Sequence, residues 1–307
     1  MNPKFETRDT SSKANSLRSA RASAILKVSP GTIEAIRAGT TPKADPLSVA
    51  KVAAIQSAKQ TSTLIPYCHP IPLTYAGVEL ELRPDQIVAV SDVKAVWNTG
   101  VEMEAIVAAA TAVVTLYDML KAIDDTMEIV SVRLVEKKGG KSSVQGPGAG
   151  LKAAVIVLSD SVSKGMSEDR SGKLILQRLQ DFHIQVPQFK IMPDDGPALQ
   201  TELRKFSDSG EIDLIITSGG TGLGPRDITP EATQAVIDRR LEGVEEAFRS
   251  FGQDRTRTAM LSRGVVGVRG STIIVNLPGS PSAVEDGFNA LFPTILHAFR
   301  MMKGDRH

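Results

Sequence analysis

The pattern of hydrophobic and polar positions changes character near residue 150. After this point, continuous apolar runs alternate with stretches of helical spacing, as expected for strands that are buried on both faces of a parallel sheet. The apolar runs predict strands over residues 153–158, 185–191, 213–217 and 272–276. Helical spacing predicts helices over residues 172–180, 197–206, 230–238 and 282–298. The second half is therefore expected to be a three-layer α/β domain with a mostly parallel sheet.

The first half has a mixed pattern. Helical spacing covers residues 46–58 and the Ala-rich segment 100–124. Residues 75–82, 86–90 and 129–136 instead have the spacing of strands. This half is expected to be an α+β domain of the ferredoxin-like type.

A short segment without apolar periodicity separates the two halves. Residues 142–150 read SSVQGPGAG, and this Gly, Ser and Pro content is typical of a linker. The predicted domains are therefore residues 1–141 and 151–307, and each is long enough to bury its own core. Because the chain has no visible internal repeat, two different folds are expected.

Charge and composition exclude several classes of partner. The chain has 17 Lys and Arg against 15 Asp and Glu up to Gly150, and 19 against 20 after it. Such balance argues against nucleic-acid binding, and an aromatic content of 4% leaves few rings for base stacking. With one cysteine, no signal region and no long uncharged apolar span, the sequence predicts a cytoplasmic protein without a membrane partner. Its partners are expected to be small molecules.

Residues 213–230, DLIITSGGTGLGPRDITP, predict a strand that ends in a loop of small residues. Glycines let backbone N–H groups approach a phosphate closely. The spacing fits neither the Walker A loop nor the dinucleotide-binding loop. A plain turn is the alternative, and the accompanying hydroxyl, Arg and Asp side chains favour a phosphate site. Its candidate residues are Ser218, Gly219, Gly220, Thr221, Gly222 and Arg226.

Asp194 and Asp227 are the expected ligands of a Mg²⁺ ion. Each follows a predicted strand, and ligands bind at the carboxyl ends of such strands. Mg²⁺ is commonly held by one or two carboxylates together with a substrate phosphate. Alternatively, residues 194–197, DDGP, form only a turn and a helix cap. A second strand-to-helix turn, with Gly279 and Ser280, is either an anion site or a plain cap.

For three candidate residues of the first half, a purely structural role is the alternative. His69 lies between prolines in LIPYCHPIP, so its backbone is extended, and position alone favours a structural role over a catalytic one. The neighbouring Cys68 is expected to point away from it, which argues against a Cys-His nucleophile pair. Glu102 and Glu104 lie at an expected helix start, where carboxylates complement the helix dipole without any catalytic role.

Asp118 and Lys121 lie three residues apart on one face of the same predicted helix. A surface ion pair is the usual explanation for this spacing. Because the surrounding helix is apolar on nearly every side, the pair is expected to be desolvated or at an interface, where it can serve as acid and base. Glu104 and Asp118 would be about 21 Å apart along a straight helix. They therefore belong either to separate sites or to one site that a symmetric dimer completes.

The second half resembles the MogA/MoaB family of molybdenum-cofactor biosynthesis, typified by molybdopterin adenylyltransferase, over about residues 151–303. The resemblance implies that the pterin phosphate of molybdopterin attacks the α-phosphorus of Mg-ATP and that pyrophosphate leaves. Asp194 and Asp227 match the two functional acids of the family. The matching blocks are residues 159–161, 169–172, 215–222, 226–230, 258–263 and 276–281.

The first half resembles the MoaC family of cyclic pyranopterin monophosphate synthases over about residues 5–143. The resemblance implies conversion of 3′,8-cyclo-7,8-dihydro-GTP into cyclic pyranopterin monophosphate with release of pyrophosphate. Asp118 and Lys121 match the acid-base pair of the family. Residues 93–98, VKAVWN, and Ser143 depart from its pattern. The other matching functional positions are Lys43, His69, Glu102, Glu104 and Lys141.

Together the two resemblances predict a bifunctional enzyme that catalyses two non-consecutive steps of molybdenum-cofactor biosynthesis. It is expected to be a homo-oligomer whose N-terminal site lies at a dimer interface. In the main alternative, the second half binds pterin or assists assembly without catalysis. A third hypothesis is that the second half transfers a nucleotidyl group to an unrelated acceptor.

Overall fold

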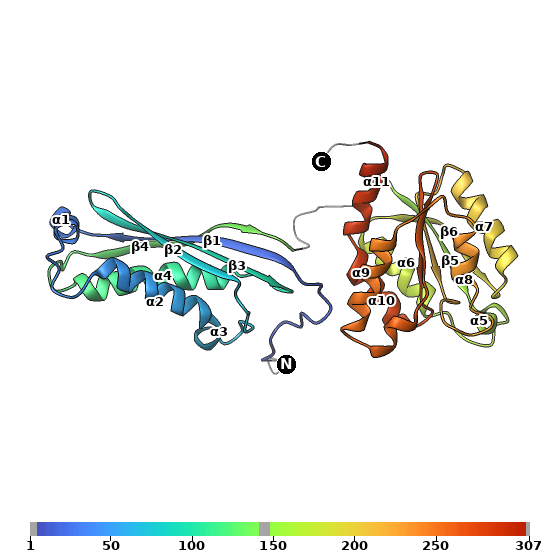
Figure 1. The fold of residues 1–307 in the computed structure, drawn as a ribbon, viewed down its shortest axis with the longest axis horizontal. Coiled ribbons are helices and arrows are strands. Elements are labelled where there is room, and N and C mark those ends of the chain that lie inside the picture. The colour runs from blue at the N-terminus through green and yellow to red at the C-terminus, as the bar shows by residue number, and fades with distance from the viewer. Residues whose placement is uncertain (1–4, 141–147, 305–307) are drawn as a thin grey trace. The chain divides into compact units, whose positions relative to one another are not determined.

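The computed structural model describes residues 5–140 and 148–304 (Figure 1). The chain divides into two compact units, Met1–Ser143 and Val144–His307. Most of the predicted linker, residues 142–147, and the candidate site residue Lys141 lie outside the described residues. Each unit has its own sheet and its own hydrophobic core.

The first unit has a four-stranded sheet in the order β2-β3-β1-β4, in which all neighbours are antiparallel. Three of these strands agree with the predicted segments, although β3 continues well beyond residue 90. The central strand β1 was not predicted, because its buried positions include the small residues Ala20, Ala22 and Ala24. The strands are β1 (Ser16–Lys27), β2 (Tyr75–Leu82), β3 (Gln86–Trp97) and β4 (Glu128–Lys138).

Helices α2 and α4 cover one face of this sheet (Figure 1). The predicted Ala-rich helix is confirmed as α4, and the strand β1 beneath it is also rich in alanine. Small side chains on both elements let the helix approach the sheet closely. By length and composition α4 alone among the described helices could span a bilayer, but nine of its residues are buried against this unit. The helices are α1 (Pro30–Ala38), α2 (Pro46–Lys59), α3 (Thr61–Leu64) and α4 (Glu102–Leu120).

The second unit has a six-stranded sheet in the order β6-β5-β7-β10-β9-β8. The first four strands are parallel, as predicted, and β9 and β8 continue the sheet in antiparallel pairing. These last two strands were not predicted, because they are only four and two residues long. The strands are β5 (Lys152–Leu158), β6 (Gln185–Met192), β7 (Leu214–Ser218), β8 (Arg239–Arg240), β9 (Val266–Arg269) and β10 (Thr272–Leu277).

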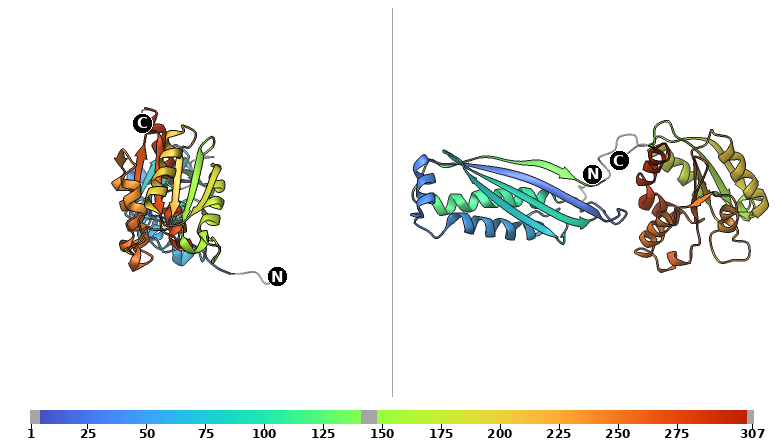
Figure 2. Two further views of the ribbon diagram at one scale, coloured as in Figure 1. Left: turned by 90° about the vertical axis from the view of Figure 1, so that its right-hand side faces the viewer. Right: turned by 45° about the horizontal axis from the view of Figure 1, so that its top comes forward.

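Helices lie on both sides of this sheet, so the unit has the predicted three layers (Figures 1 and 2). Alternate residues of β5 face the two sides: Val155 packs with α6 and α10, and Ile156 packs with α7. The helices are α5 (Asp160–Ser163), α6 (Ser171–Asp181), α7 (Gly196–Asp208), α8 (Thr229–Gln234), α9 (Glu242–Gln253), α10 (Pro281–Leu291) and α11 (His297–Met302), with 3₁₀ helices η2 (Arg257–Leu261) and η3 (Thr294–Leu296).

Two helix predictions for this unit need correction. The helix predicted over residues 282–298 is in fact α10, η3 and α11, because Pro293 lacks the N–H that would continue the first helix. The helix predicted over residues 230–238 is the shorter α8, which begins at Thr229 and ends at Gln234.

Candidate functional site

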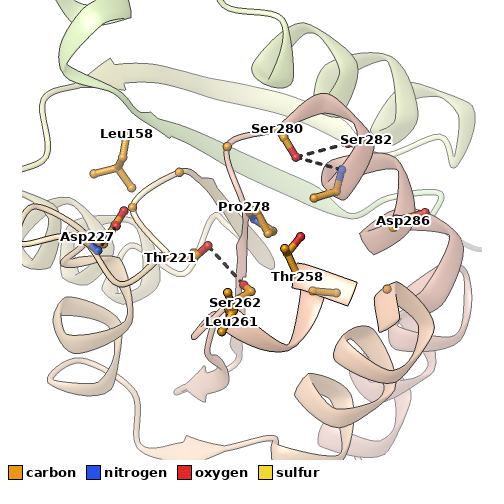
Figure 3. A pocket seen from close by; sticks show the side chains of 18 of the residues that line it. Leu158, Thr221, Asp227, Thr258, Leu261, Ser262, Pro278, Ser280, Ser282 and Asp286 are labelled. Atoms are coloured by element: carbon orange, nitrogen blue, oxygen red, sulfur yellow. Dashed lines mark hydrogen bonds between the residues drawn. The ribbon is translucent and has the colours of Figure 1, made fainter. Parts of the chain in front are cut away.

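A cavity of about 830 Å³ opens in the second unit at the carboxyl ends of β5, β7 and β10 (Figure 3). This is the edge of the sheet where ligands of such folds bind. Every candidate site residue that the sequence singled out in this half lines the cavity, except Ser218. On the other side of the cavity, α9, η2, the turn between them and α10 contribute side chains that include Phe248, Arg249, Arg255, Thr258 and Asp286.

The loop after β7 passes so close to its neighbours that glycine is required. Gly219 and Gly220 have φ angles of +106° and +62°, in the left-handed region. A Cβ atom on Gly219 would meet the carbonyl oxygen of Leu158, and one on Gly220 would meet Thr229. Gly279 of the adjacent turn packs against this loop, and a Cβ on it would be in ordinary contact, 3.4 Å from the Cα of Gly219. This wall of the cavity is therefore built largely of backbone.

The two hydroxyl groups of the loop differ in position. Ser218 is buried at the end of β7 and donates a hydrogen bond of 3.2 Å to the carbonyl oxygen of Pro278. It links the ends of two strands and does not line the cavity, and its role in phosphate binding stays a prediction. Thr221 does line the cavity, and its hydroxyl lies 3.4 Å from that of Ser262 (Figure 3).

Arg263 holds the glycine-rich loop in shape. Its Nε donates to the carbonyl oxygen of Gly222 at 2.7 Å, and its Nη2 donates to that of Asp227 at 2.7 Å. Its Nη1 pairs with Glu231 at the start of α8. The carboxylate of Asp227 accepts a hydrogen bond of 2.7 Å from the backbone N–H of Gly224. Asp227 is thus fixed both by its backbone and by its side chain.

Asp194 lies across the loop from Asp227. Burial and the nearby charge of Asp160 raise the pKa of Asp194, while Arg226 lowers it. Its Oδ1 is buried without a hydrogen-bond partner, 3.2 Å from where a Cβ of Gly220 would lie. An acceptor in this position fits a Mg²⁺ ligand, since Mg²⁺ needs only one or two carboxylates when it is also bound to phosphate.

Arg226 and Asp160 form an ion pair near Asp194. Nη2 of Arg226 lies 2.8 Å from Oδ1 of Asp160 and 3.5 Å from the backbone oxygen of Asp194. The sequence placed Asp160 after a strand, but Asp160 was not selected as a site residue. In the described part of the chain, no three His, Cys, Asp or Glu side chains are grouped so that they could hold a metal ion.

Two residues in the turns around the predicted site serve as helix caps. Asp195 accepts a hydrogen bond of 2.9 Å from the N–H of Ala198 and begins α7, in agreement with the capping alternative for this turn. Ser280 caps α10 in the same way, through the N–H of Ala283, and also lines the cavity. The cap does not remove Ser280 from the site.

Arg255 and Asp286 were not predicted. Asp286 lies on α10 with 19% of its side chain exposed, and its Oδ1 is 3.5 Å from Nε of Arg255. Burial raises the pKa of Asp286, and Arg255 opposes this effect. The guanidinium of Arg255 lies 3.4 Å from the ring centre of Phe251, and its Nη1 donates to the backbone oxygen of Phe251 at 2.6 Å. Neither charged residue is part of a recognisable loop motif, so no local pattern pointed to them.

In the first unit, Asp118 lies between two lysines. Its Oδ2 is 2.9 Å from Nζ of Lys43, and its Oδ1 is 2.7 Å from Nζ of Lys121. Hydrogen bonds from Lys121 and Lys43 lower the pKa of Asp118 to about 2. All three side chains are about half exposed, so the pair is not desolvated within the single chain, and its location at an interface stays a prediction. Only the tertiary fold brings Lys43 to this pair.

Glu104 and Glu102 begin α4, as predicted, but in different environments. Glu104 is 4% exposed, and burial raises its pKa to about 6. Glu102 is more exposed and pairs with Lys137 at 3.3 Å. Burial, together with negative charge on Glu104, raises the pKa of Cys68. His69 lies next to this cysteine, half-buried, in a segment without helix or strand.

Comparisons with known proteins divide the chain in the same way. The MoaC family model matches residues 7–140, and the model of a probable molybdopterin binding domain matches residues 154–297. The chain is 44% identical to the molybdenum cofactor biosynthesis bifunctional protein of Chlorobaculum tepidum, over 97% of this chain and 95% of that protein. It therefore belongs to the family of bifunctional molybdenum cofactor biosynthesis proteins.

Each half also has separate relatives. The first half is 51% identical over 138 residues to the cyclic pyranopterin monophosphate synthase of a Nostoc species, covering 44% of this chain and 81% of that protein. The second half is similar to the solved structure of the molybdopterin biosynthesis enzyme MoaB from Thermus thermophilus, with 39% identity and a TM-score of 0.48. That match covers 50% of this chain and 98% of the other.

Proposed function

We propose that the first unit is a cyclic pyranopterin monophosphate synthase. It would convert 3′,8-cyclo-7,8-dihydro-GTP into cyclic pyranopterin monophosphate and release pyrophosphate. The observation that carries the proposal is the group of Asp118, Lys43 and Lys121, which combines two cations with an ionised carboxylate. The Nostoc relative bears the name of this activity.

We assign the βαββαβ order of the unit, with its antiparallel sheet, to the ferredoxin-like class.

The charges of this group suit the chemistry. Lys43 and Lys121 can bind the triphosphate of the substrate and stabilise the pyrophosphate as it leaves. Asp118 is ionised at neutral pH and can accept a proton, whereas Glu104, with a pKa of about 6, can both donate and accept one near neutrality. His69, Glu102 and Lys141 are assigned to the site by the family resemblance.

We propose that the second unit adenylates molybdopterin. An oxygen of the pterin phosphate would attack the α-phosphorus of ATP, and the bond to the β-phosphate would break with release of pyrophosphate. The unpartnered oxygen of Asp194 opposite the glycine-rich loop carries this proposal. Asp194 and Asp227 would hold Mg²⁺, which neutralises phosphate charge when bound. Arg226 is expected to exchange Asp160 for a substrate phosphate.

The test is a pair of separate reactions on the intact protein. The first supplies 3′,8-cyclo-7,8-dihydro-GTP and measures cyclic pyranopterin monophosphate. The second supplies molybdopterin and Mg-ATP and measures adenylated pterin. If pterin binds but no adenylated product forms, the second unit is a binding module, and the open cavity would then serve for transfer or assembly. Adenylation of a different acceptor would point to an unrelated nucleotidyl transfer. We expect both reactions to occur in the cytoplasm and in a homo-oligomer.

A further inference from the structure

The cavity of the second unit has two chemically different ends (Figure 3). Asp227 and Leu158 mark one end, where the glycine-rich loop and Arg226 suit phosphates. Asp286 lies at the opposite end, beyond Pro278 and Thr258. This second end lacks the glycine-rich loop, and the carboxylate of Asp286 offers a hydrogen-bond acceptor there. A ligand that spans the cavity can therefore place its phosphate at one end and hydrogen-bond donors against Asp286 at the other.

Asp286 lies on α10 in the cavity wall and contacts Arg255. Its partner Arg255 is itself fixed by stacking on Phe251 and by a hydrogen bond to the backbone oxygen of that residue. The contact between Arg255 and Asp286 is 3.5 Å, at the outer limit of a hydrogen bond. The neighbouring Glu285 instead pairs with Arg178 and does not line the cavity. Asp286 is thus the acidic side chain that α10 presents to the ligand.

The two ligands of the proposed reaction differ in what they can offer to a carboxylate. The pyrimidinone edge of a pterin carries the N3–H and the 2-amino group side by side, and these two donors match the two oxygens of a carboxylate. Adenine offers its 6-amino donor beside the N1 acceptor, so one of its positions would face a carboxylate oxygen without a hydrogen. Unpaired polar groups of this kind are strongly disfavoured in a partly buried site.

We propose that Asp286 binds the N3–H and 2-amino edge of the pterin, so that the pterin ring occupies the end of the cavity formed by α9, η2 and α10. The phosphates then lie at the glycine-rich loop. This inference rests on the proposed adenylation of molybdopterin and adds to it the residue that selects the pterin and the direction in which the pterin lies.

The test uses the intact protein and two fluorescent probes. One is 6-hydroxymethylpterin phosphate, and the other is its analogue with oxygen in place of the 2-amino group. We expect the protein to bind the first probe about tenfold or more tightly than the second, because only the first has both donors. Asp286→Asn should remove this preference, and Asp286→Glu should retain part of it. Glu285→Gln is the matched control and should behave as the unchanged protein does.

A parallel titration with ATP distinguishes failure of this inference from failure of the proposed function. If Asp286→Asn loses pterin but retains ATP within about twofold, the inference is supported. If the unchanged protein binds both probes equally, or if Asp286→Asn keeps the preference, the inference is wrong while the proposed function stands. If the unchanged protein binds neither probe, the proposed function and the inference both fail. Because the probe preference is measured first on the unchanged protein, a variant that misfolds does not decide the result.

Discussion

Glu104 is a carboxyl group that the fold keeps away from water, in the first turn of α4. Its folded-state pKa of about 6 exceeds the ordinary value of 4.5, so the folded state binds the proton more readily than the unfolded state does. The ionised carboxylate of Glu104 therefore lowers the stability of the folded state. This loss of stability is absent below pH 4.5, grows between pH 4.5 and 6, and is complete above pH 6. The fold keeps this residue at a cost to stability near neutral pH.

Replacing Glu104 by Gln should stabilise the first unit by about 2 kcal/mol at pH 7.5, and this gain should disappear as the pH falls towards 4.5. Trp97 is the only tryptophan and lies in β3, so its fluorescence in a urea titration reports the unfolding of this unit. Glu102→Gln is the control and should show no such pH-dependent gain. A pH-independent effect of Glu104→Gln would mean that the carboxyl group is not desolvated.

In the second unit, the single side chain of Arg263 fixes the backbone around Gly222 and Asp227. Lysine cannot reproduce two bonds in fixed and different directions from one planar group. We expect Arg263→Lys to lower the rate of adenylation about tenfold or more, because a small displacement of positioning groups is costly. Binding of 6-hydroxymethylpterin phosphate should fall by less than about threefold. Arg257→Lys, at an exposed position of η2, is the control, and equal losses in both variants would contradict the positioning role.

At the scale of elements, the close contact between α4 and β1 is central to the packing of the first unit. Ala109 of α4 is fully buried. Ala109→Val should destabilise the unit by about 1–3 kcal/mol, because the added methyl groups overpack the core around α4. The change is measured by urea unfolding followed at Trp97. Val114→Leu, at a position that is 55% exposed on the same helix, should have little effect. Equal stability of both variants would show that the contact is not tightly packed.

Local patterns determine what the sequence could and could not predict. Long apolar runs such as residues 153–158 identified the parallel strands, because burial on both faces leaves an uninterrupted pattern. The central strand β1 was missed because alanine, serine and arginine give no strong alternation. The loop residues of the second site were found because glycines after a strand carry a local signal. Asp286 and Arg255 were missed because α9, η2 and α10 meet at the cavity only in the tertiary fold.

At the scale of the whole molecule, the length of α4 limits how the first site is assembled. Glu104 and Asp118 lie on this one helix, fourteen residues apart, which corresponds to about 21 Å. A single small substrate cannot contact both side chains of one chain directly. The exposure of Asp118, Lys43 and Lys121 in the single chain agrees with a site that a second copy completes. We expect the Glu104 end of one protomer to meet the Asp118 end of another.

This arrangement predicts complementation between two inactive proteins. Glu104→Gln and Asp118→Asn should each abolish formation of cyclic pyranopterin monophosphate when tested alone. After the two are mixed, unfolded and refolded together, half of the dimers carry both substitutions on different chains, and each of these has one intact site. The mixture should then recover about a quarter of the original activity. The control for assembly is the double variant Glu104→Gln/Asp118→Asn refolded with the unchanged protein. If this control is active while the mixture of the two single variants stays inactive, both residues act within one chain.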